Sequence, residues 1–420
     1  MHIPQKSCTF AQKKNAIMIT IRLKPHKEES LLRFHPWVFS GAIRSIQLDV
    51  DYPHAEPQEG EIVQVVATDG KVLGVGHYQI GSIAVRMLAF GVSELPANFW
   101  LDRIAEAYAM RERLGLVRDD NNSYRLVHGE GDFLPGLIVD IYADTAVVQA
   151  HSIGIHCHRK EIAEAIVKAV AQVDKVYYKS DDTLPHKAPI NGDRVGYLIG
   201  AEKADFNGDF WAKENGLDFR IDWLRGQKTG FFIDQRDNRS LLEHYARGKE
   251  VLNMFCYTGG FSVYALRGGA KLVHSVDVSQ KAIDLVRSNV AHNFGENAPH
   301  EAFAEEAFEF MANNENKYDL IVLDPPAFAK HRDAVKNALR GYQRLNAKGI
   351  QSIRPGGILF TFSCSQAIDK DMFRLAVFSA AAQVGRRVRI LHQLHQPADH
   401  PINIYHPEGE YLKGLVLEVE

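Results

Sequence analysis

The sequence is poor in cysteine and has no long apolar run. Four cysteines occur among 420 residues, with no CxxC pair: Cys8, Cys157, Cys256 and Cys364. This spacing favours neither a disulfide framework nor a zinc-finger-type site. No apolar stretch is long enough to span a bilayer, and the first residues lack the pattern of a secretory signal. We therefore expect a cytoplasmic protein with no membrane partner and no metal, in which any reactive cysteine acts as a free thiol.

An excess of charge of one sign is also lacking. The chain has 49 Lys and Arg against 52 Asp and Glu, a formal net charge of -3. This balance does not indicate general nucleic-acid binding, so any such contact needs a local basic patch. The length, with 45% hydrophobic and 24% charged residues, is typical of a globular chain of two or three domains.

The hydropathy pattern changes along the chain and predicts an α/β protein with several parts. Residues 1–17 are polar and aperiodic, which indicates a disordered tail and leaves open whether translation starts at Met1 or Met18. Short β-like runs over 18–93, separated by Gly, Asp and Pro, predict a small all-β domain. Residues 94–205 mix helix and strand patterns, as in a central α+β domain. From 206 to 420 strands and helices alternate, which predicts a Rossmann-like, doubly wound parallel sheet.

The carboxyl ends of the strands in this last region are where a ligand is expected, near the point at which the strand order reverses. The predicted strands cover 249–255, 272–278, 318–324 and 356–363, and the predicted helices cover 260–269, 279–293 and a long segment through 343–353.

Two features at the first strand ends favour an adenosine-containing cofactor. Gly259 and Gly260 let the backbone approach a ligand, and Tyr257 could border an adenosine. Asp277, at the end of the next strand, can accept both hydrogen bonds of a ribose diol. Taken alone, the glycine pair is explained equally well as a packing turn, and Asp277 equally well as a helix N-cap. At this spacing the pair favours the cofactor, although the motif is not GxGxxG.

Acidic residues follow the next two predicted strands. The segment 300–310 is a third strand candidate whose Glu306 could reach an adenine amino group, although acidity at a helix start explains it nearly as well. Asp324 follows a wholly apolar run, and Pro325 and Pro326 fix a rigid turn after it. A carboxylate held there can accept a hydrogen bond from the edge of a base, while a purely structural turn is the alternative.

Cys364 follows the strand predicted to lie beside the one that ends at Asp324. Neighbouring strands are about 5 Å apart, so the thiol and the carboxylate should face one pocket. A cysteine after a strand is more often inert and buried. The neighbouring carboxylate makes Cys364 a candidate nucleophile.

At this point the motifs carry a family resemblance. NMFCYTGGFSVYAL, VDVSQKAIDLVRSNV, DLIVLDPPAFAK and FTFSCS resemble the S-adenosylmethionine (SAM) motifs of class I methyltransferases, in particular the RlmI-like family of bacterial ribosomal RNA cytosine-5 methyltransferases. KTGFFIDQRDNR resembles that family's motif before the first strand. LLRFHPWVFSGAI resembles its amino-terminal PUA domain, YRLVHGEGDFLPGLIVD its central domain, and DHPINIYHPEGEYLKGL its carboxyl end. The family contains relatives with other base targets.

The resemblance implies SAM as cofactor and the 23S RNA of the large ribosomal subunit as partner. It implies Cys364 and Asp324 as catalytic residues. The residues that it implies for the cofactor are Phe232, Gln235, Arg236, Asn253, Phe255, Tyr257, Thr258, Gly259, Asp277, Val278, Glu306, Asp324 and Pro325. Many class I enzymes have an acidic residue and several glycines where this chain has Asn253, Phe255 and Tyr257, and the RlmI-like subgroup is similar to this chain there.

The implied chemistry begins with addition of the Cys364 thiolate to carbon 6 of cytosine, which makes carbon 5 nucleophilic. Asp324 would hydrogen-bond or protonate N3. A base must then remove the carbon-5 proton, and the sequence does not identify it. The target nucleotide must also leave its stack.

Cationic and aromatic residues alternate near the amino terminus, in the segment that resembles a PUA domain. This pattern suits structured RNA, although core aromatics with solvated charges explain it equally well without the resemblance. The predicted RNA-binding residues are Lys24, Lys27, Arg33, His35, Trp37 and, in the carboxyl-terminal region of the chain, Arg239.

Two alternatives stay open at the level of sequence. Asp-Pro-Pro followed by Phe328 also resembles motifs that orient an amino group, which indicates a nitrogen-directed base methyltransferase without need of a thiol. A non-catalytic RNA-binding or assembly protein that retains the cofactor fold is the other. The sequence leaves open the modified nucleotide, the choice between naked RNA and an assembled particle, and whether the chain forms a homodimer.

Overall fold

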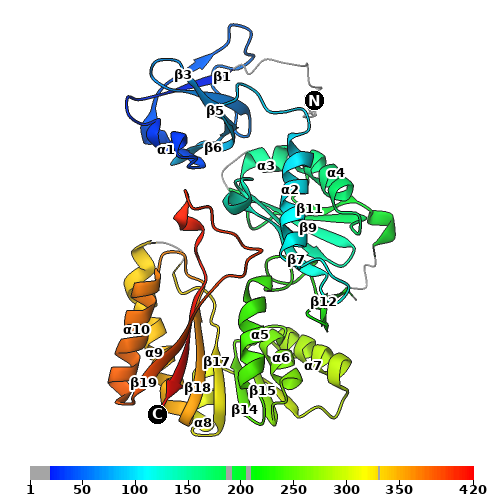
Figure 1. Ribbon diagram of the computed structural model, residues 1–420, viewed down its shortest axis with the longest axis vertical. Helices are drawn as coiled ribbons and strands as arrows, with labels where there is room; N and C mark the ends of the chain where they lie inside the picture. Colours follow the sequence, from blue (N-terminus) through cyan, green and yellow to red (C-terminus); the bar gives the residue numbers. More distant parts are fainter. Residues whose placement is uncertain (1–18, 186–191, 205–209, 330–331) are drawn as a thin grey trace, which may run out of the picture. The chain divides into compact units, whose positions relative to one another are not determined.

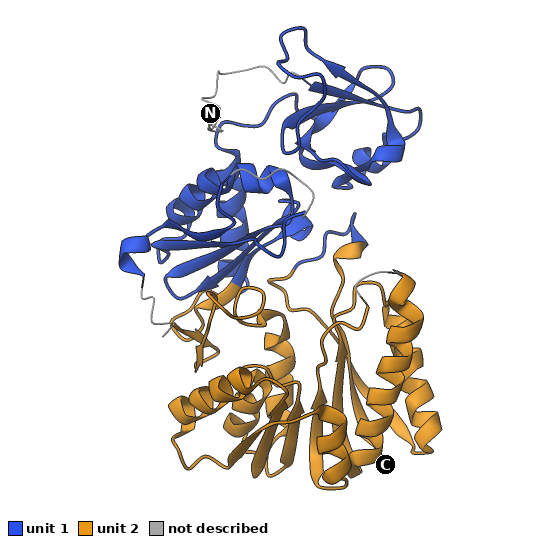
Figure 2. Cartoon of the chain, turned by 180° about the vertical axis from the view of Figure 1, so that it is seen from behind, with its two compact units in different colours: residues 1–115, 125–204, 401–407 blue, residues 116–124, 205–400, 408–420 orange. Residues whose placement is uncertain are grey.

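The computed structural model describes residues 19–185, 192–204, 210–329 and 332–420 (Figure 1). The predicted tail at 1–17 lies outside these residues. The chain forms two compact units (Figure 2). Unit 1 comprises residues 1–115, 125–204 and 401–407, and unit 2 comprises residues 116–124, 205–400 and 408–420. The segment 401–407 thus packs with unit 1 although it lies near the carboxyl end.

The first part of unit 1 is all-β, as the sequence predicts. Alternation sets the inner face of its first strand, where Ile19, Ile21 and Leu23 are buried and the residues between them are half-buried. A short helix, α1 (Glu29–Leu32), precedes the second strand. The six-stranded sheet has the order β2 (Trp37–Phe39), β6 (Ile83–Phe90), β5 (Val72–Tyr78), β4 (Ile62–Val66), β1 (Ile19–Leu23) and β3 (Ile43–Leu48).

The second part of unit 1 is a five-stranded sheet with helices, which agrees with the α+β prediction. Its central strand, β9 (Thr145–Ala150), is buried at every position, as a continuous apolar run allows. Helices α2 (Phe99–Arg113) and α4 (Arg159–Ala169) pack together, and α3 (Ile153–Cys157) leads into α4. The strand order is β11 (Val195–Ile199), β10 (Lys175–Lys179), β9 (Thr145–Ala150), β8 (Leu137–Tyr142) and β7 (Ser123–His128).

Unit 2 contains the predicted doubly wound sheet, with seven strands. All neighbours are parallel up to β18, whereas β20 runs antiparallel between β18 and β19. A hairpin of β12 (Trp211–Glu214) and β13 (Leu217–Arg220) lies outside the sheet. The order is β16 (His300–Ala304), β15 (Leu272–Asp277), β14 (Glu250–Met254), β17 (Tyr318–Leu323), β18 (Ile353–Ser363), β20 (Lys413–Val419) and β19 (Val388–His395).

Helices cover both faces of this sheet (Figure 1). The successive strand residues Val251 and Leu252 belong to different cores, one under α5 and α6 and the other under α8, α9 and α10. Helix α7 packs beside α6. The bounds are α5 (Arg236–Tyr245), α6 (Gly260–Arg267), α7 (Gln280–Phe294), α8 (Ala307–Asn313), α9 (Val335–Ser352) and α10 (Lys370–Val384).

One predicted strand is shorter than expected. The sequence predicts a strand over 300–310, but only His300–Ala304 is one, and α8 begins at Ala307. The Glu306 carboxylate accepts hydrogen bonds from the backbone N–H groups of Phe308 and Glu309, so this side chain starts the helix. Local capping therefore ends the strand pattern.

Two negative findings apply to the described part of the chain. None of its helices combines the length and the apolar character needed to cross a membrane. It also contains no cluster of three or more His, Cys, Asp or Glu side chains arranged to hold a metal ion.

Candidate active site

The candidate site lies where β14 and β17 end, at the point where the strand order reverses. These strands pair in parallel, with Met254 opposite Leu323, so Phe255 and Asp324 leave the sheet side by side. Leu323 is in turn opposite Thr361 of β18, which ends two residues later and is followed by Cys364. The topology therefore gathers the three predicted motifs at one edge of the sheet.

The loop after β14 has an unusual backbone. Phe255 and Tyr257 have φ angles of 57° and 46°, and Gly259 has 81°. Two non-glycine residues at positive φ within three positions store backbone strain, a feature that concentrates at ligand sites. A Cβ on Gly259 would stand 2.9 Å from a Val286 methyl carbon, so glycine is needed there for space as well as for its φ angle.

Asp277 fixes this loop to the end of β15. One carboxylate oxygen accepts a hydrogen bond from the Tyr257 N–H at 3.1 Å, and the other accepts one from the Ser279 N–H at 3.0 Å. Asp277 is not the N-cap of α7, because the Ser279 hydroxyl accepts from the Ala282 N–H instead. Each Asp277 oxygen keeps a lone pair, as a ribose diol requires, and the next residue, Val278, is 74% exposed.

An aromatic pair borders the same loop. The rings of Phe232 and Tyr257 meet edge to face with centroids 5.1 Å apart. The Tyr257 hydroxyl donates to the Gly230 carbonyl and accepts from the Gln227 N–H. These contacts fasten the segment before α5 against the loop after β14, so the two motifs form one wall.

The hydrogen-bond acceptors and aromatic rings at this edge of the sheet fit an adenosine cofactor. At the penultimate residue of β14, the buried Asn253 amide donates to the Ser262 hydroxyl, and its Oδ1 has no hydrogen-bond partner among the described residues. A buried acceptor left unpaired is unfavourable by about 1–3 kcal/mol, which a ligand donor would relieve. Together with Asp277 and the aromatic pair, this acceptor matches the polar and apolar parts of a nucleoside.

Asp324 occupies the end of β17 and is half-buried. Burial and, second, the nearby Asp234 carboxylate together raise the pKa of its carboxyl group to about 7, although the hydrogen bond from Gln235 opposes the shift. The Gln235 amide donates to Asp324 Oδ2 at 3.1 Å, and its own oxygen accepts from Asn238 at 2.6 Å. Asp324 is therefore a group that can hold or release a proton near neutral pH.

Cys364 is half-buried and in the electrostatic range of Asp324. Burial, with the carboxylates of Asp324 and Asp234, raises the pKa of its thiol to about 11, although Lys228 opposes the shift. The thiol is thus protonated near neutral pH. The structure places it with Asp324, as the sequence predicts.

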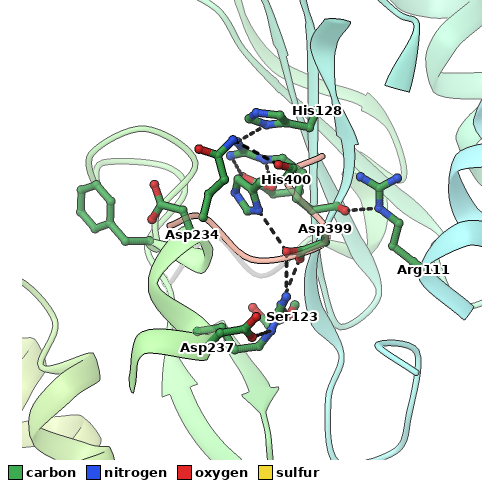
Figure 3. Close-up of polar contacts among 12 residues, drawn as sticks. Arg111, Ser123, His128, Asp234, Asp237, Asp399 and His400 are labelled. Carbon is green, nitrogen blue, oxygen red and sulfur yellow. Dashed lines mark hydrogen bonds and ion pairs between the residues drawn. The ribbon is translucent and has the colours of Figure 1, made fainter. Parts of the chain in front are cut away.

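Two arginines of the KTGFFIDQRDNR motif are engaged inside the protein. Arg236 is 2% exposed and forms a two-point ion pair with Asp399 at 2.7 and 3.0 Å. Figure 3 shows Asp399 between His400 and the start of α5. Burial opposes the charge, but Asp399 raises the pKa of the Arg236 guanidinium above its usual range. The role of Arg236 at the cofactor stays a prediction.

Arg239 differs more clearly from the prediction that it contacts RNA. It is 2% exposed, and its guanidinium donates to both carboxylate oxygens of Glu214 at 2.9 and 2.7 Å and to the Phe232 carbonyl at 2.9 Å. All three nitrogens are used inside unit 2. The structure therefore offers no surface at which Arg239 could reach a phosphate.

The other predicted cofactor residues lie around the same edge of the sheet. Thr258 is buried, and its carbonyl accepts from Asn289 of α7 at 2.8 Å. Pro325 is buried after β17. Glu306 is exposed, and one of its oxygens is occupied by the N-terminus of α8. Its contact with an adenine amino group stays a prediction.

The predicted RNA-binding residues of unit 1 divide into two groups. Lys27 and Trp37 line one pocket together with Ser30, Phe39 and Gly41. Lys24 is exposed and donates to the Gly41 carbonyl at the same pocket.

His35 and Trp37 also pack on the segment 401–407. The Trp37 ring lies 4.2 Å from that of His406, and its indole N–H donates to Glu130 at 2.9 Å. The His35 ring is 5.7 Å from His406. Arg33 is exposed and 3.5 Å from Glu29. The predicted stretch is thus partly a packing surface and partly an open cationic one.

Sequence patterns do not single out Asp234, which acts electrostatically on Asp324, or Tyr411, which contacts Asp234. Asp234 is buried, and Tyr411 donates to it at 2.7 Å. Asp234 stands inside the KTGFFIDQRDNR motif and Tyr411 inside the carboxyl-terminal one, so the motifs were available, but their proximity to Asp324 depends on the topology.

Comparison with known proteins agrees with this geometry. A family model of S-adenosylmethionine-dependent methyltransferases matches residues 204–407, and one of PUA-like domains matches residues 21–90. A SAM-dependent methyltransferase from Streptococcus mutans has the same fold, with 22% identity, a TM-score of 0.79, and coverage of 96% of this chain and 100% of that one. Another methyltransferase, solved in complex with SAH, is 22% identical with a TM-score of 0.80 over the same shares. The fold and the site define a SAM-dependent methyltransferase with an amino-terminal PUA-like domain.

Curated relatives narrow the class. "Ribosomal RNA large subunit methyltransferase I" of Alteromonas mediterranea is 40% identical over 402 residues, covering 94% of this chain and 98% of its own. The protein of the same name from Shewanella denitrificans is 39% identical over 410 residues, covering 96% and 99%. The chain belongs to this family, the ribosomal RNA large subunit methyltransferases I.

Proposed function

We propose that the protein methylates carbon 5 of a cytosine in large-subunit ribosomal RNA through a covalent adduct with Cys364. One observation carries the proposal: the Cys364 thiol and the Asp324 carboxyl group share the ends of neighbouring strands and act on each other electrostatically. Methyl transfer to a nitrogen needs no thiol at that position. The names of the curated relatives support large-subunit RNA as the substrate.

When bound, SAM supplies an electrophilic methyl group. Asp277, Tyr257, Phe232 and Asn253 would hold its nucleoside beside the strained loop. Gly259, packed against Val286 of α7 with a positive φ, would hold that loop in place.

The residues of this chain carry the substrate chemistry. The Cys364 sulfur bonds to carbon 6 of the cytosine, and the electron pair displaced from the ring makes carbon 5 nucleophilic. Asp324, whose pKa of about 7 leaves it partly protonated, donates a proton to N3 and removes the developing negative charge. Loss of the carbon-5 proton after methyl transfer lets the sulfur leave, which regenerates the thiolate.

The test is mass spectrometry of nucleosides from large-subunit RNA of cells that lack this gene. The RNA is treated with SAM and either the wild-type protein or Cys364→Ala. We expect 5-methylcytidine with the wild type and a loss of at least a hundredfold with the variant, since the nucleophile is gone. Cys157→Ala, at an exposed cysteine of unit 1, should retain activity, and SAM binding by calorimetry should be equal in all three proteins.

A different product would reassign the reaction. A methylated purine formed by both the wild type and Cys364→Ala would make the thiol structural and favour nitrogen methylation. Normal SAM binding without a methylated product on naked RNA or on isolated large-subunit particles would contradict the proposed substrate.

A further inference from the structure

Four polar side chains form a continuous line of hydrogen bonds that begins at the candidate cofactor site. The Asn253 amide nitrogen lies 2.9 Å from the Ser262 hydroxyl. That hydroxyl lies 2.6 Å from the Ser275 hydroxyl, which in turn lies 2.8 Å from Nε2 of His300. These four residues make up the Asn253–His300 network.

The sheet explains why these residues meet. Asn253 of β14 is in register with Ser275 of β15, and His300, the first residue of β16, is in register with Val273. Because every second side chain of a strand points to the same face, Val273 and Ser275 share a face with both partners. Val273 belongs to the core under α5 and α6, so this is the face on which α6 supplies Ser262.

The inner members of the network are shielded from water. Asn253, Ser262 and Ser275 are buried, and His300 is half-buried. Among the described residues, the two hydroxyl groups make no other hydrogen bond. Each hydroxyl has a single proton, so it must donate to one neighbour and accept from the other. The protons of the network therefore all point the same way.

Two directions satisfy both hydroxyl groups. In the first, the Asn253 amide donates to Ser262, Ser262 donates to Ser275, and Ser275 donates to Nε2 of His300, whose ring proton then lies on Nδ1. In the second, Nε2–H of His300 donates to Ser275 and every bond reverses, so Ser262 donates to the amide oxygen. The two directions turn opposite ends of the Asn253 amide away from the network.

Two observations favour the first direction. The nitrogen of Asn253 contacts Ser262, whereas its Oδ1 has no hydrogen-bond partner among the described residues. Burial, with nearby His274 and Arg287, lowers the pKa of the His300 imidazole to about 4, so the ring is neutral near pH 7 and has a nitrogen that can accept. An amide oxygen kept outside the network can accept from the ammonium or hydroxyl groups of SAM.

We propose that Ser262, Ser275 and His300 hold the Asn253 amide so that its oxygen faces bound SAM and accepts a hydrogen bond from it. His300 sets the direction, because only the tautomer with its proton on Nδ1 leaves Nε2 able to accept. The three are positioning residues, since they act through Asn253. Their part rests on the place that the proposed function gives to SAM beside Asn253, and not on the cytosine chemistry.

The first experiment determines the tautomer of His300 by NMR of the full-length protein with ¹⁵N-labelled histidine, near pH 7 and without SAM or RNA. The His300 signals are assigned by their loss in His300→Phe. We expect Nδ1 to carry the proton and Nε2 to carry none. A proton on Nε2 overturns the proposal, because the network would then run in the other direction.

The second experiment measures SAM affinity by calorimetry in a cycle of single and double variants. Ser275→Ala releases the Ser262 hydroxyl, which can then donate to the amide oxygen of Asn253 and turn it away from SAM. We expect binding to weaken roughly fivefold, as for the loss of one hydrogen bond. In an Asn253→Ala background, Ser275→Ala should cause no further loss, because it acts only through the amide.

The control is Ser352→Ala, which removes a buried hydroxyl that donates to the Met311 carbonyl at the end of α9. It should leave both SAM affinity and the His300 signals unchanged. Equal losses from Ser275→Ala with and without Asn253 would overturn action through the amide.

If Ser275→Ala does not fold, His300→Phe is measured in the same cycle. It removes the acceptor at the far end and keeps both hydroxyl groups, so the same dependence on Asn253 is expected, and a loss independent of Asn253 overturns the proposal. Neither measurement uses RNA. An absence of 5-methylcytidine would therefore refute the proposed reaction alone.

Discussion

At the scale of single residues, the site depends on groups whose protonation the fold has altered. Asp324 is nearer to neutrality than an ordinary aspartate, and Cys364 is harder to ionise than an ordinary cysteine. Both shifts arise first from burial, which disfavours the charged form of an acid. They have opposite uses in the proposed reaction, since Asp324 must carry a proton and Cys364 must lose one.

The raised pKa of Asp324 predicts a pH-dependent effect of Asp324→Asn on stability. An acid whose folded-state pKa lies above its unfolded value of about 4 keeps its proton longer in the folded state, so folding stability falls as the pH rises from about 4 to about 7. Asparagine is always neutral, so the variant does not lose folding stability over this pH range. Without SAM, we expect the variant to be more stable than the wild type by roughly 1–3 kcal/mol at pH 8.5 and by much less at pH 5, as measured by thermal unfolding.

Asp319, at the other end of the same strand, provides the control. Although burial opposes it, hydrogen bonds from the Glu250 N–H and from Arg354 hold the pKa of its carboxyl group below the usual value. Asp319 is thus ionised throughout this pH range, and Asp319→Asn should be destabilising by a constant amount. A difference between Asp324→Asn and the wild type that did not vary with pH would contradict the assignment for Asp324.

At the scale of secondary-structure elements, the turn from β14 into α6 joins the sheet to the cofactor wall. Gly259 precedes α6 with φ 81° and ψ 23°, and its missing side chain leaves room for Val286 of α7. The conformation and the contact thus both require glycine.

Gly259→Ala is expected to weaken SAM binding at least tenfold in calorimetry and to lower the free energy of unfolding by about 2 kcal/mol or more. About 1 kcal/mol comes from the left-handed conformation, and the rest from the 2.9 Å approach to Val286. Gly385, after α10, has nearly the same conformation (φ 76°, ψ 22°) and open space around it. Gly385→Ala should therefore lose only the stability that the left-handed conformation costs, and it should bind SAM normally. Equal losses in both variants would show that the contact with Val286 does not contribute.

The start of α5 is held by the ion pair between Arg236 and Asp399, which links the motif before β14 to the segment after β19 (Figure 3). Asp399→Ala leaves the buried guanidinium unpaired and should lower the free energy of unfolding by about 3–5 kcal/mol, as measured by urea denaturation. Asp237, the exposed neighbour 3.7 Å from the same arginine, is the control, and its alanine variant should change stability by less than about 1 kcal/mol. Comparable losses of stability in both variants would show that the buried ion pair stabilises the fold no more than the exposed one.

At the scale of the whole molecule, the residues of the proposed reaction belong to unit 2, whereas the open cationic surface with Lys24 and Lys27 belongs to unit 1. The near balance of acidic and basic residues means that RNA affinity must come from such local surfaces.

The double variant Lys24→Ala, Lys27→Ala should bind large-subunit RNA more weakly and with a lower salt dependence. The slope of log affinity against log salt concentration should fall by roughly one for each phosphate that the protein no longer neutralises, as measured by filter binding at several salt concentrations. SAM affinity should not change. Lys168→Ala, at an exposed lysine of α4, is the control, and an unchanged slope in the double variant would place RNA binding elsewhere.

The sequence by itself determined the elements and the order of the motifs. The carboxyl ends of three strands could be located from the sequence. Two are marked by apolar runs that end in Asp277 and Asp324, and one by the glycine pair that follows the first strand. This was possible because side-chain periodicity and turn-forming residues are local properties. The same local information failed at 300–310, where a capping glutamate ends the strand, and it did not predict the hairpin of β12 and β13.

Only the tertiary structure decided which charges face the site and which are used internally. Arg236 and Arg239 look like ligand-binding cations in the sequence, but their partners Asp399 and Glu214 are 163 and 25 residues away. Lys413 lies 50 positions from Ser363 in the chain and becomes its neighbour because β20 pairs antiparallel with β18. Electrostatics depends on distance and burial in space, so the protonation of Cys364 and Asp324 follows from the packing of distant strands and not from the motifs that contain them.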